Sequence, residues 1–457
     1  MNSEVCPEGI ITIKGEALQI LSINNLNDKF SSVEVPLRYT PRKMMITKEK
    51  NIIVIEADQH SYSNYERGKF KEKIVEISKD SNYSKLKDKD IGAPYTAEGN
   101  WGSCIRIISP INNMKTIDLI EFEENEAAIS SCLCSFLSSP NDTYLIVGTA
   151  KDLKLLPHRS YSSANIVVFL LKENGTKIEF VFKQPIDDIA LAFCEYQGKL
   201  LAGIGSNLVL YELGKAHLLK KCETKKITST ITQIQTNGQR ILVSTMNESF
   251  YFLRHKISEN QFYIFADDVI PRWITTSIFL DYDTIAGSDK FENFFIYRLP
   301  PGADEESSDD PMGTKKKWEV GYLHGAAYKL NLIAQYHLGD LITSMQKTSF
   351  HGENENVICF GTTSGKIGVF LPFETREEVD FFVHLEMYER IEIDNIAGRD
   401  HQMFRSCYGP VKCVIDGDLC EEFMSLEGEK RKSLASELDK NENDIINKLE
   451  DMRNKII

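Results

Sequence analysis

The sequence lacks the hydrophobic segments that carry a chain into or across a membrane. No run of eighteen apolar residues occurs in its 457 residues, so no transmembrane helix is expected. The N-terminal residues are polar and acidic before they become apolar, unlike the basic start of a signal peptide. The ten cysteines have no regular spacing, and we interpret them as reduced, buried thiols of an intracellular protein.

An excess of positive charge is also missing. The chain has 53 lysines and arginines against 67 acidic residues, a net charge of -14 and an isoelectric point near 5.3. Affinity for nucleic acid over the whole surface needs a basic face, so any RNA contact is expected to be indirect or weak. The basic residues of 67–73 are interleaved with glutamates, which predicts a solvated loop.

Catalytic motifs are absent as well. The chain has no Gly-x-Ser-x-Gly and no phosphate-binding loop. Gly203-Ile204-Gly205 lacks the third glycine and the following helix of a dinucleotide loop, and it predicts a β-hairpin. The histidines stand singly, without a nucleophile, base and orienting group in sequence reach. We therefore predict a protein that is not an enzyme and that holds no cofactor.

One acidic stretch resembles a calcium loop in part. Asp281, Asp283, Asp289 and Glu292 match its first, third, ninth and twelfth positions, but Ala286 replaces the glycine that such loops need. We interpret these carboxylates as hydrogen-bond acceptors for turn amides.

One group of potential zinc ligands is present. Its members are His401, Cys407, Cys413 and Cys420, which lack the closely spaced pairs that zinc sites usually contain. Buried thiols are the preferred interpretation, so no metal site is predicted.

The stretch Phe265–Pro300 shows the pattern that dominates the chain. Trp273–Leu280 and Asn293–Leu299 are rich in β-branched and aromatic residues, and the polar turn Gly287–Lys290 lies between them. Such runs around a glycine-centred turn predict antiparallel strands. Units of this kind begin near Leu201, Ile241 and Thr284, and a period of roughly forty residues is that of a four-stranded propeller blade. The sequence therefore predicts an all-β fold of the β-propeller (WD40-like) type.

The pattern changes after the last predicted strand. Thr375 and Glu378 fit a helix capping box, and Phe381, Leu385 and Tyr388 share one helical face. A second apolar stripe lies near the C-terminus, with Asn441 as a possible cap. We predict a propeller over 1–374, with solvated or disordered insertions at 61–98 and 301–317, and a small α-helical domain over 375–457. The helical stripes are expected to pack on the propeller or on each other.

Several short runs resemble one protein family. The runs are CPEGI (6–10), YTPRK (39–43), NEAA (125–128), GTAKDL (148–153), ENQFYIFADDVIPRW (259–273), LDYDTIAGSDKF (280–291), RLPP (298–301), GRDHQMFRS (398–406) and PVKCVIDGDLCEEF (410–423). Together they are similar to the C-terminal part of the family that unites splicing factor 3b subunit 3, the large subunit of the UV-damaged-DNA-binding complex and the largest cleavage and polyadenylation specificity subunit. The runs at 267–273 and 280–284 resemble the splicing branch.

The resemblance implies a fold and a function. Family members carry three seven-bladed propellers and a C-terminal helical domain, so this chain would be the third, seven-bladed propeller with that domain. The implied role is a nuclear scaffold that contacts the helical-repeat subunit and small subunits of the splicing factor 3b complex during pre-mRNA splicing. Two alternatives stay open: an adaptor of a cullin ubiquitin ligase in DNA-damage recognition, and direct binding of nucleic acid.

The residues predicted to contact partners are arginines, tryptophans and a histidine in or near these runs, because such side chains dominate protein interfaces. They are Arg42, Trp101, Arg272, Trp273, Arg399, His401 and Arg405. An internal role is the alternative for each: Arg272 would then pair with Asp267 or Asp268, and Trp273 would fill the space between blades. Asp416 and Asp418 are predicted to cap a helix that starts near Leu419.

Overall fold

The structure is a computed structural model that describes residues 9–14, 17–22, 35–59, 96–111, 114–311, 313–321, 325–349, 357–393 and 400–455. It divides into two units, one of residues 1–36 with 457 and one of residues 37–456. The first unit contains an antiparallel hairpin of β1 (Gly9–Lys14) and β2 (Ala17–Ser22). Most of the predicted insertion at 61–98 lies outside the described residues.

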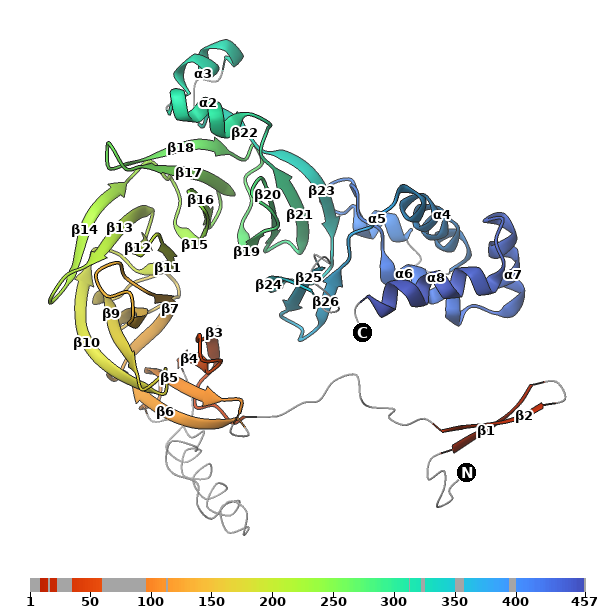
Figure 1. Ribbon diagram of the computed structural model, residues 1–457, viewed down its shortest axis with the longest axis horizontal. Coiled ribbons are helices and arrows are strands. Elements are labelled where there is room, and N and C mark those ends of the chain that lie inside the picture. The colour runs from red at the N-terminus through yellow and green to blue at the C-terminus, as the bar shows by residue number, and fades with distance from the viewer. Residues whose placement is uncertain are drawn as a thin grey trace, which may run out of the picture. The chain divides into compact units, whose positions relative to one another are not determined.

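Six sheets, or blades, follow one another along the second unit, and their strands pair antiparallel except for one short strand of the fourth (Figure 1). Blade 1 consists of β3 (Pro41–Ile46), β4 (Ile52–Gln59), β5 (Trp101–Ser109) and β6 (Lys115–Glu121). Blade 2 consists of β7 (Glu126–Cys134), β8 (Thr143–Lys151), β9 (Ser163–Lys172) and β10 (Lys177–Ile186). Blade 3 consists of β11 (Ala190–Tyr196), β12 (Lys199–Ile204), β13 (Asn207–Leu213) and β14 (Leu218–Thr224). The Gly203–Gly205 segment thus forms the predicted hairpin between β12 and β13.

The other three blades differ in strand number. Blade 4 consists of β15 (Ile231–Asn237), β16 (Arg240–Thr245), β17 (Phe250–Lys256), β18 (Gln261–Asp267) and the short β22 (Tyr328–Lys329). Blade 5 consists of β19 (Ile274–Phe279), β20 (Thr284–Asp289), β21 (Asn293–Arg298) and β23 (Asn331–His337). Blade 6 has three strands, β24 (Ile342–Thr348), β25 (Val357–Thr362) and β26 (Ile367–Phe370). The first strand of each blade contacts the first strand of the next, which is the arrangement of a propeller.

The prediction of an all-β propeller is confirmed, but the expected seventh blade is not found among the described residues. Beyond β26 the chain enters helix α4 at Arg376, so the described part of the second unit supplies no further strands. The repeating strand pattern predicted a propeller without setting the blade number, which came from the family resemblance.

Packing between neighbouring blades forms the core. Phe250 and Phe252 of blade 4 lie in one cluster with Phe295 and Tyr297 of blade 5. The rings of Phe250 and Phe295 meet edge to face with centroids 6.0 Å apart. Gly287 lies against the same rings, where an added Cβ would come within 2.7 Å of both. Gly287 lies within β20 rather than in the turn predicted at 287–290, and its lack of a side chain lets the two blades approach.

The segment after blade 5's third strand is helical, which corrects the prediction of a disordered loop at 301–317. Helix α2 (Ala303–Asp309) and helix α3 (Thr314–Val320) lie within or overlap this segment. Ala303 is buried in the core between blades 4 and 5, and the hydroxyl of Tyr328 donates to Glu306. The acidic composition suggested full solvation, but these two contacts fasten α2 to blade 4.

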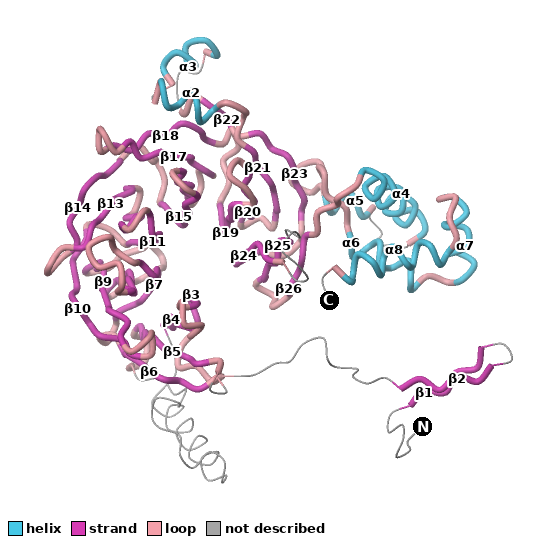
Figure 2. Tube along the Cα trace, viewed as in Figure 1, coloured by secondary structure: helices cyan, strands magenta, loops and turns pink. Residues whose placement is uncertain are grey.

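A group of helices follows the last strand (Figure 2). They are α4 (Arg376–Glu392), α5 (His401–Arg405), α6 (Gly417–Glu421), the 3₁₀ turn η2 (Glu422–Ser425), α7 (Gly428–Glu437) and α8 (Glu442–Asn454). The predicted capping box is confirmed, since Thr375 Oγ1 accepts from the Glu378 amide at 3.2 Å and Glu378 reaches back to the Thr375 amide. Asn441 is the N-cap of α8, as predicted. No described helix is both long and apolar enough to span a membrane.

The apolar stripes of these helices pack on each other, as expected. Phe381 and Leu385 of α4 share one cluster with Phe423 and with Ile445 and Leu449 of α8. The proposed domain boundary at 374/375 stays a prediction, because the division of the chain into two units falls at Pro36 instead.

Candidate protein-interaction surface

Four exposed aromatic side chains define the candidate surface, which we name the aromatic surface: Trp273, Phe291, Phe404 and Tyr408. Their exposed fractions are 40%, 39%, 46% and 60%. Trp273 precedes β19, and Phe291 lies in the turn between β20 and β21. Phe404 lies on α5, and Tyr408 follows it. Residues about 130 positions apart in sequence therefore contribute to one surface, and the contacts below connect them.

Three ring contacts and one cation join the members. The rings of Phe291 and Tyr408 have centroids 5.5 Å apart. The ammonium group of Lys290 lies 3.0 Å from the centroid of Trp273 and 5.2 Å from that of Phe291. The imidazole of His337, at the end of β23, contacts both Phe404 and Tyr408 with centroid distances of 5.2 and 5.6 Å. Exposed aromatic rings of this kind are what protein interfaces bury.

The turn that presents Phe291 is shaped by Asp289. Its Oδ1 atom accepts from the backbone amides of Phe291 at 2.9 Å and Asn293 at 3.1 Å. Asp281 acts in the same way on the amides of Asp283 at 2.8 Å and Thr284 at 2.6 Å. The interpretation of these aspartates as acceptors for turn amides is confirmed. No group of three potential metal ligands occurs in the described residues.

Arg272 lies beneath the aromatic surface and is buried. Its guanidinium donates to the hydroxyl of Tyr297 at 3.0 Å and to Gln335 Oε1 at 2.9 Å. Its ion pair is with Asp289 at 3.4 Å, rather than with the aspartates at 267 and 268 that the sequence suggested. The guanidinium carbon also lies 4.2 Å from the ring centroid of Phe295. Arg272 therefore supports the turn and is not itself available to a partner.

A second buried cluster holds α5 and α6 against blade 5. Asp416 Oδ2 accepts from Arg405 Nε at 2.8 Å and from His401 Nε2 at 2.6 Å. Arg405 Nη1 donates to the backbone carbonyl of Leu338 at 2.7 Å, just beyond β23. Asp416 is also the N-cap of α6, as predicted, and accepts from the amides of Asp418 and Leu419. We name His401, Arg405 and Asp416 the Asp416 cluster.

The electrostatics of the Asp416 cluster keep the carboxylate charged. Burial by itself raises the pKa of Asp416, but the hydrogen bond from His401 and the charge of Arg405 outweigh it. The pKa is therefore held well below its usual range. A charged, fully paired Asp416 fixes the position of α5, and α5 carries Phe404.

The other predicted contact residues divide into three groups. Trp101 is buried at the start of β5, and its indole donates to the Leu153 carbonyl at 2.7 Å, so its position is internal. Arg42 is exposed on β3, and its Nε donates to the Ala57 carbonyl at 2.8 Å. Both belong to blade 1 and are not brought to the aromatic surface. Arg399 lies outside the described residues. Trp273 is exposed and stacked under Lys290, so it does not fill a space between blades.

Sequence reasoning missed Phe291, Phe404 and Tyr408. A usable signal existed for Phe291, because a large aromatic residue next to a turn has no strand face on which to be buried. The cysteines of the potential zinc group are only partly as predicted. Cys420 is buried, as expected. Cys407 and Cys413 are exposed, which corrects the interpretation of all three as buried thiols.

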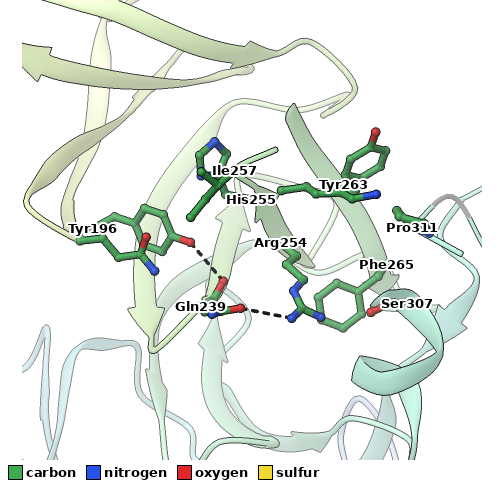
Figure 3. A pocket seen from close by; sticks show the side chains of 11 residues that line it. Tyr196, Gln239, Arg254, His255, Ile257, Tyr263, Phe265, Ser307 and Pro311 are labelled. Atoms are coloured by element: carbon green, nitrogen blue, oxygen red, sulfur yellow. Dashed lines mark hydrogen bonds between the residues drawn. The ribbon is translucent and has the colours of Figure 1, made fainter. Parts of the chain in front are cut away.

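A pocket of about 230 Å³ lies where α2 covers blade 4 (Figure 3). Arg254 and Tyr263 line it from the blade, and Ser307 and Pro311 line it from the helical segment. Arg254 donates to Gln239 Oε1 at 3.1 Å across its floor. The pocket shows that the segment at 301–317 forms a defined surface with blade 4.

Comparisons with known proteins agree with the fold. Residues 102–425 match the family model described as the CPSF A subunit region. The chain is 42% identical over 99% of its length to "Splicing factor 3B subunit 3" of Danio rerio, and 42% identical over its whole length to "Spliceosome-associated protein 130 A" of Arabidopsis thaliana. It is 38% identical over its whole length to "Pre-mRNA-splicing factor rse1" of Emericella nidulans. The chain spans only 38%, 39% and 37% of the lengths of these three relatives.

Proposed function

Since the chain belongs to the family of the CPSF A subunit region and its relatives are named as splicing factors, we propose that it is a scaffold in pre-mRNA splicing. It would act without catalysis, in the nucleus, as part of the splicing factor 3b complex. The partners would be the helical-repeat subunit and small subunits of that complex. Identity of about 40% over nearly the full chain to proteins with splicing names is the observation that carries this proposal.

The aromatic surface supplies a physical basis for partner binding. Trp273 and Tyr408 present large rigid rings with little conformational entropy to lose, and Lys290 adds a cation at the same place. A protein partner would gain binding energy from burying these rings. The net charge of -14 offers no comparable basis for binding RNA over the whole surface.

Two finer features of the proposal come from the sequence pattern and from the family resemblance, in that order. We propose that residues 1–374 and 375–457 act as separate propeller and helical domains. We further propose that the complete propeller has seven blades, as family members do, although the described residues form six. Both expectations concern the longer proteins of which this chain covers about 38%.

The proposal is tested by substituting the exposed tryptophan of the aromatic surface. We expect Trp273→Ala in the tagged full chain to lower recovery of splicing factor 3b subunits from nuclear extract by about 30-fold, the effect of losing an interface anchor worth ~2 kcal/mol. Quantitative mass spectrometry after nuclease treatment measures this. Trp318→Ala is the matched control, because Trp318 is 89% exposed on α3 and lies outside the aromatic surface.

Other results would contradict the proposal. Recovery of a cullin ligase in place of the splicing subunits would favour the adaptor alternative. Loss of the subunits after nuclease treatment alone would favour direct nucleic-acid binding, with the steep salt dependence expected of phosphate contacts. An equal loss for both tryptophan variants would remove the aromatic surface from the proposal.

A further inference from the structure

Blade 6 ends in a strand whose outer edge is open to pairing. Within the described residues β26 is the terminal strand of a three-stranded sheet, whereas every other blade has at least four strands. The Thr362 amide donates to the Lys366 carbonyl at 3.0 Å, which makes these residues a hydrogen-bonded pair. Because such pairs alternate along an antiparallel ladder, the backbone groups of Ile367 and Val369 point away from β25, toward the sheet edge.

An apolar groove of about 530 Å³ lies beside this edge, and we name it the terminal groove. Val369 and Phe370 of β26 and Phe294 of blade 5 line one side. Phe382 of α4 and Leu449 of α8 line the other side. The partly exposed ring of Phe370 stacks on the buried ring of Phe294, with centroids 4.0 Å apart.

The cores between the other blades show what normally occupies this position. Each contains an apolar residue from the fourth strand of the later blade: Ile178 of β10, Leu218 of β14, Phe262 of β18 and Leu332 of β23. The core between blades 5 and 6 draws its blade 6 members from β24, β25 and β26 only. The terminal groove therefore lies where a fourth strand of blade 6 would insert its apolar side chains.

We propose that the terminal groove binds an extended segment of a partner polypeptide, apolar at alternate positions, which adds to β26 as the fourth strand of blade 6. The outward backbone groups of Ile367 and Val369 would pair with the backbone of the segment. Its apolar side chains would cover the partly exposed side chains of Val369 and Phe370. This inference does not depend on the splicing proposal, because it concerns backbone pairing at a different site.

The chemistry of the groove favours an extended and uncharged segment. A helix satisfies its own backbone groups and could not pair with the edge of β26. Two cations that line the groove are engaged with the protein itself: Arg453 pairs with Glu421 at 2.7 Å, and Lys347 donates to the Leu280 carbonyl at 2.5 Å. These two cations are therefore not available to an acidic segment.

The test uses a labelled peptide of residues 331–337, Asn-Leu-Ile-Ala-Gln-Tyr-His, with the full chain. This sequence is chosen because β23 already serves as the fourth strand of the neighbouring blade. Fluorescence anisotropy measures binding, and hydrogen exchange measured by mass spectrometry locates it. We expect the peptide to bind and to protect the amides of 367–370. Failure to bind, or protection elsewhere with none at β26, would overturn the proposal.

Two variants at one position separate backbone pairing from simple apolar contact. Val369→Pro removes an outward amide without touching the ladder to β25, and proline is tolerated on edge strands. We expect it to weaken peptide binding about tenfold or more, because it leaves a peptide carbonyl unpaired. Val369→Ala keeps the amide and is expected to weaken binding by about threefold at most. Equal effects of the two variants would overturn the proposal.

Peptides methylated on backbone nitrogens provide an independent test with the unaltered chain. One version carries the methyl groups on residues 332, 334 and 336, and the other on residues 331, 333 and 335. Only one set of amides can face β26, so one version is expected to bind and the other is not. Equal binding or equal loss for the two versions would contradict strand addition, even if Val369→Pro failed to fold.

Discussion

Replacement of Asp416 by alanine is expected to lower the free energy of unfolding of the helical part by about 3–5 kcal/mol, the usual cost of breaking a buried ion pair. The reason is that the partly buried Arg405 would stay beside blade 5 without its buried carboxylate partner. His401 and the first amides of α6 would also lose their acceptor. Urea denaturation, with hydrogen exchange over 401–425 to locate the loss, measures the effect.

Asp418→Ala is the matched control, because Asp418 is an exposed acid of the same helix. Because its side chain is exposed, the expected change in the free energy of unfolding is within about 0.5 kcal/mol. If Asp416→Ala were as mild as Asp418→Ala, the Asp416 cluster would not be what holds the helices to blade 5. The Asp416→Ala variant should also lose exchange protection at the amide of Phe404, since α5 carries that residue.

The stabilisation by Asp416 has a defined pH dependence. The pKa of Asp416 is lowered in the folded chain, whereas an unfolded aspartate titrates near ~3.9. The stabilising contribution is therefore present above about pH 4 and is lost as the pH falls through the lowered pKa. The difference in stability between the wild type and Asp416→Ala should accordingly shrink in acid and stay constant near neutral pH.

The second large effect is expected from Glu389→Gln, which should stabilise the helices at neutral pH. The carboxyl group of Glu389 is buried on α4, and burial raises its pKa to about 9, with the nearby charges of Glu422 and Glu386 adding to the shift. In the unfolded chain a glutamate titrates near ~4.3. Folding at pH 7 therefore costs the uptake of a proton, about 4 kcal/mol over the roughly 2.7 pH units above the unfolded pKa, at ~1.4 kcal/mol for each pH unit.

The sign of this effect distinguishes it from ordinary surface changes. Because the pKa of Glu389 is raised in the folded state, its stabilising contribution is complete below about pH 4 and is lost progressively up to about pH 9. Glutamine carries no charge, so the gain from Glu389→Gln should be small at pH 4 and grow toward pH 9. Urea denaturation across this range measures the slope. Glu377→Gln, at an exposed acid of the same helix, should show no such slope.

Local patterns were sufficient for the features that depend on neighbouring residues. The capping box of Thr375 and Glu378 could be predicted because the hydrogen bonds involved join residues three positions apart. The role of Asp416 as N-cap of α6 followed in the same way. Runs rich in β-branched and aromatic residues predicted the strands, because such side chains pack well on a pleated sheet.

The candidate surface was only half predictable. Trp273, His401 and Arg405 were named from the sequence, yet the pairing of Arg405 with Asp416 and of Lys290 with Trp273 depends on how distant elements meet. Arg272 was assigned the wrong ion-pair partner, because Asp289 reaches it only after β20 folds back along β19. The helices of 301–317 were missed because their stabilising contacts come from Tyr328 and blade 4.

The sequence by itself determined the strand and helix types, the propeller class, the helix caps and the family to which the chain belongs. These follow from periodicity, from contacts within a few residues and from recognisable runs. Only the tertiary structure decided which aromatic residues are exposed together, which arginines are buried, and where a blade lacks its fourth strand. The physical reason is that burial and edge pairing are set by elements far apart in sequence, which no local pattern encodes.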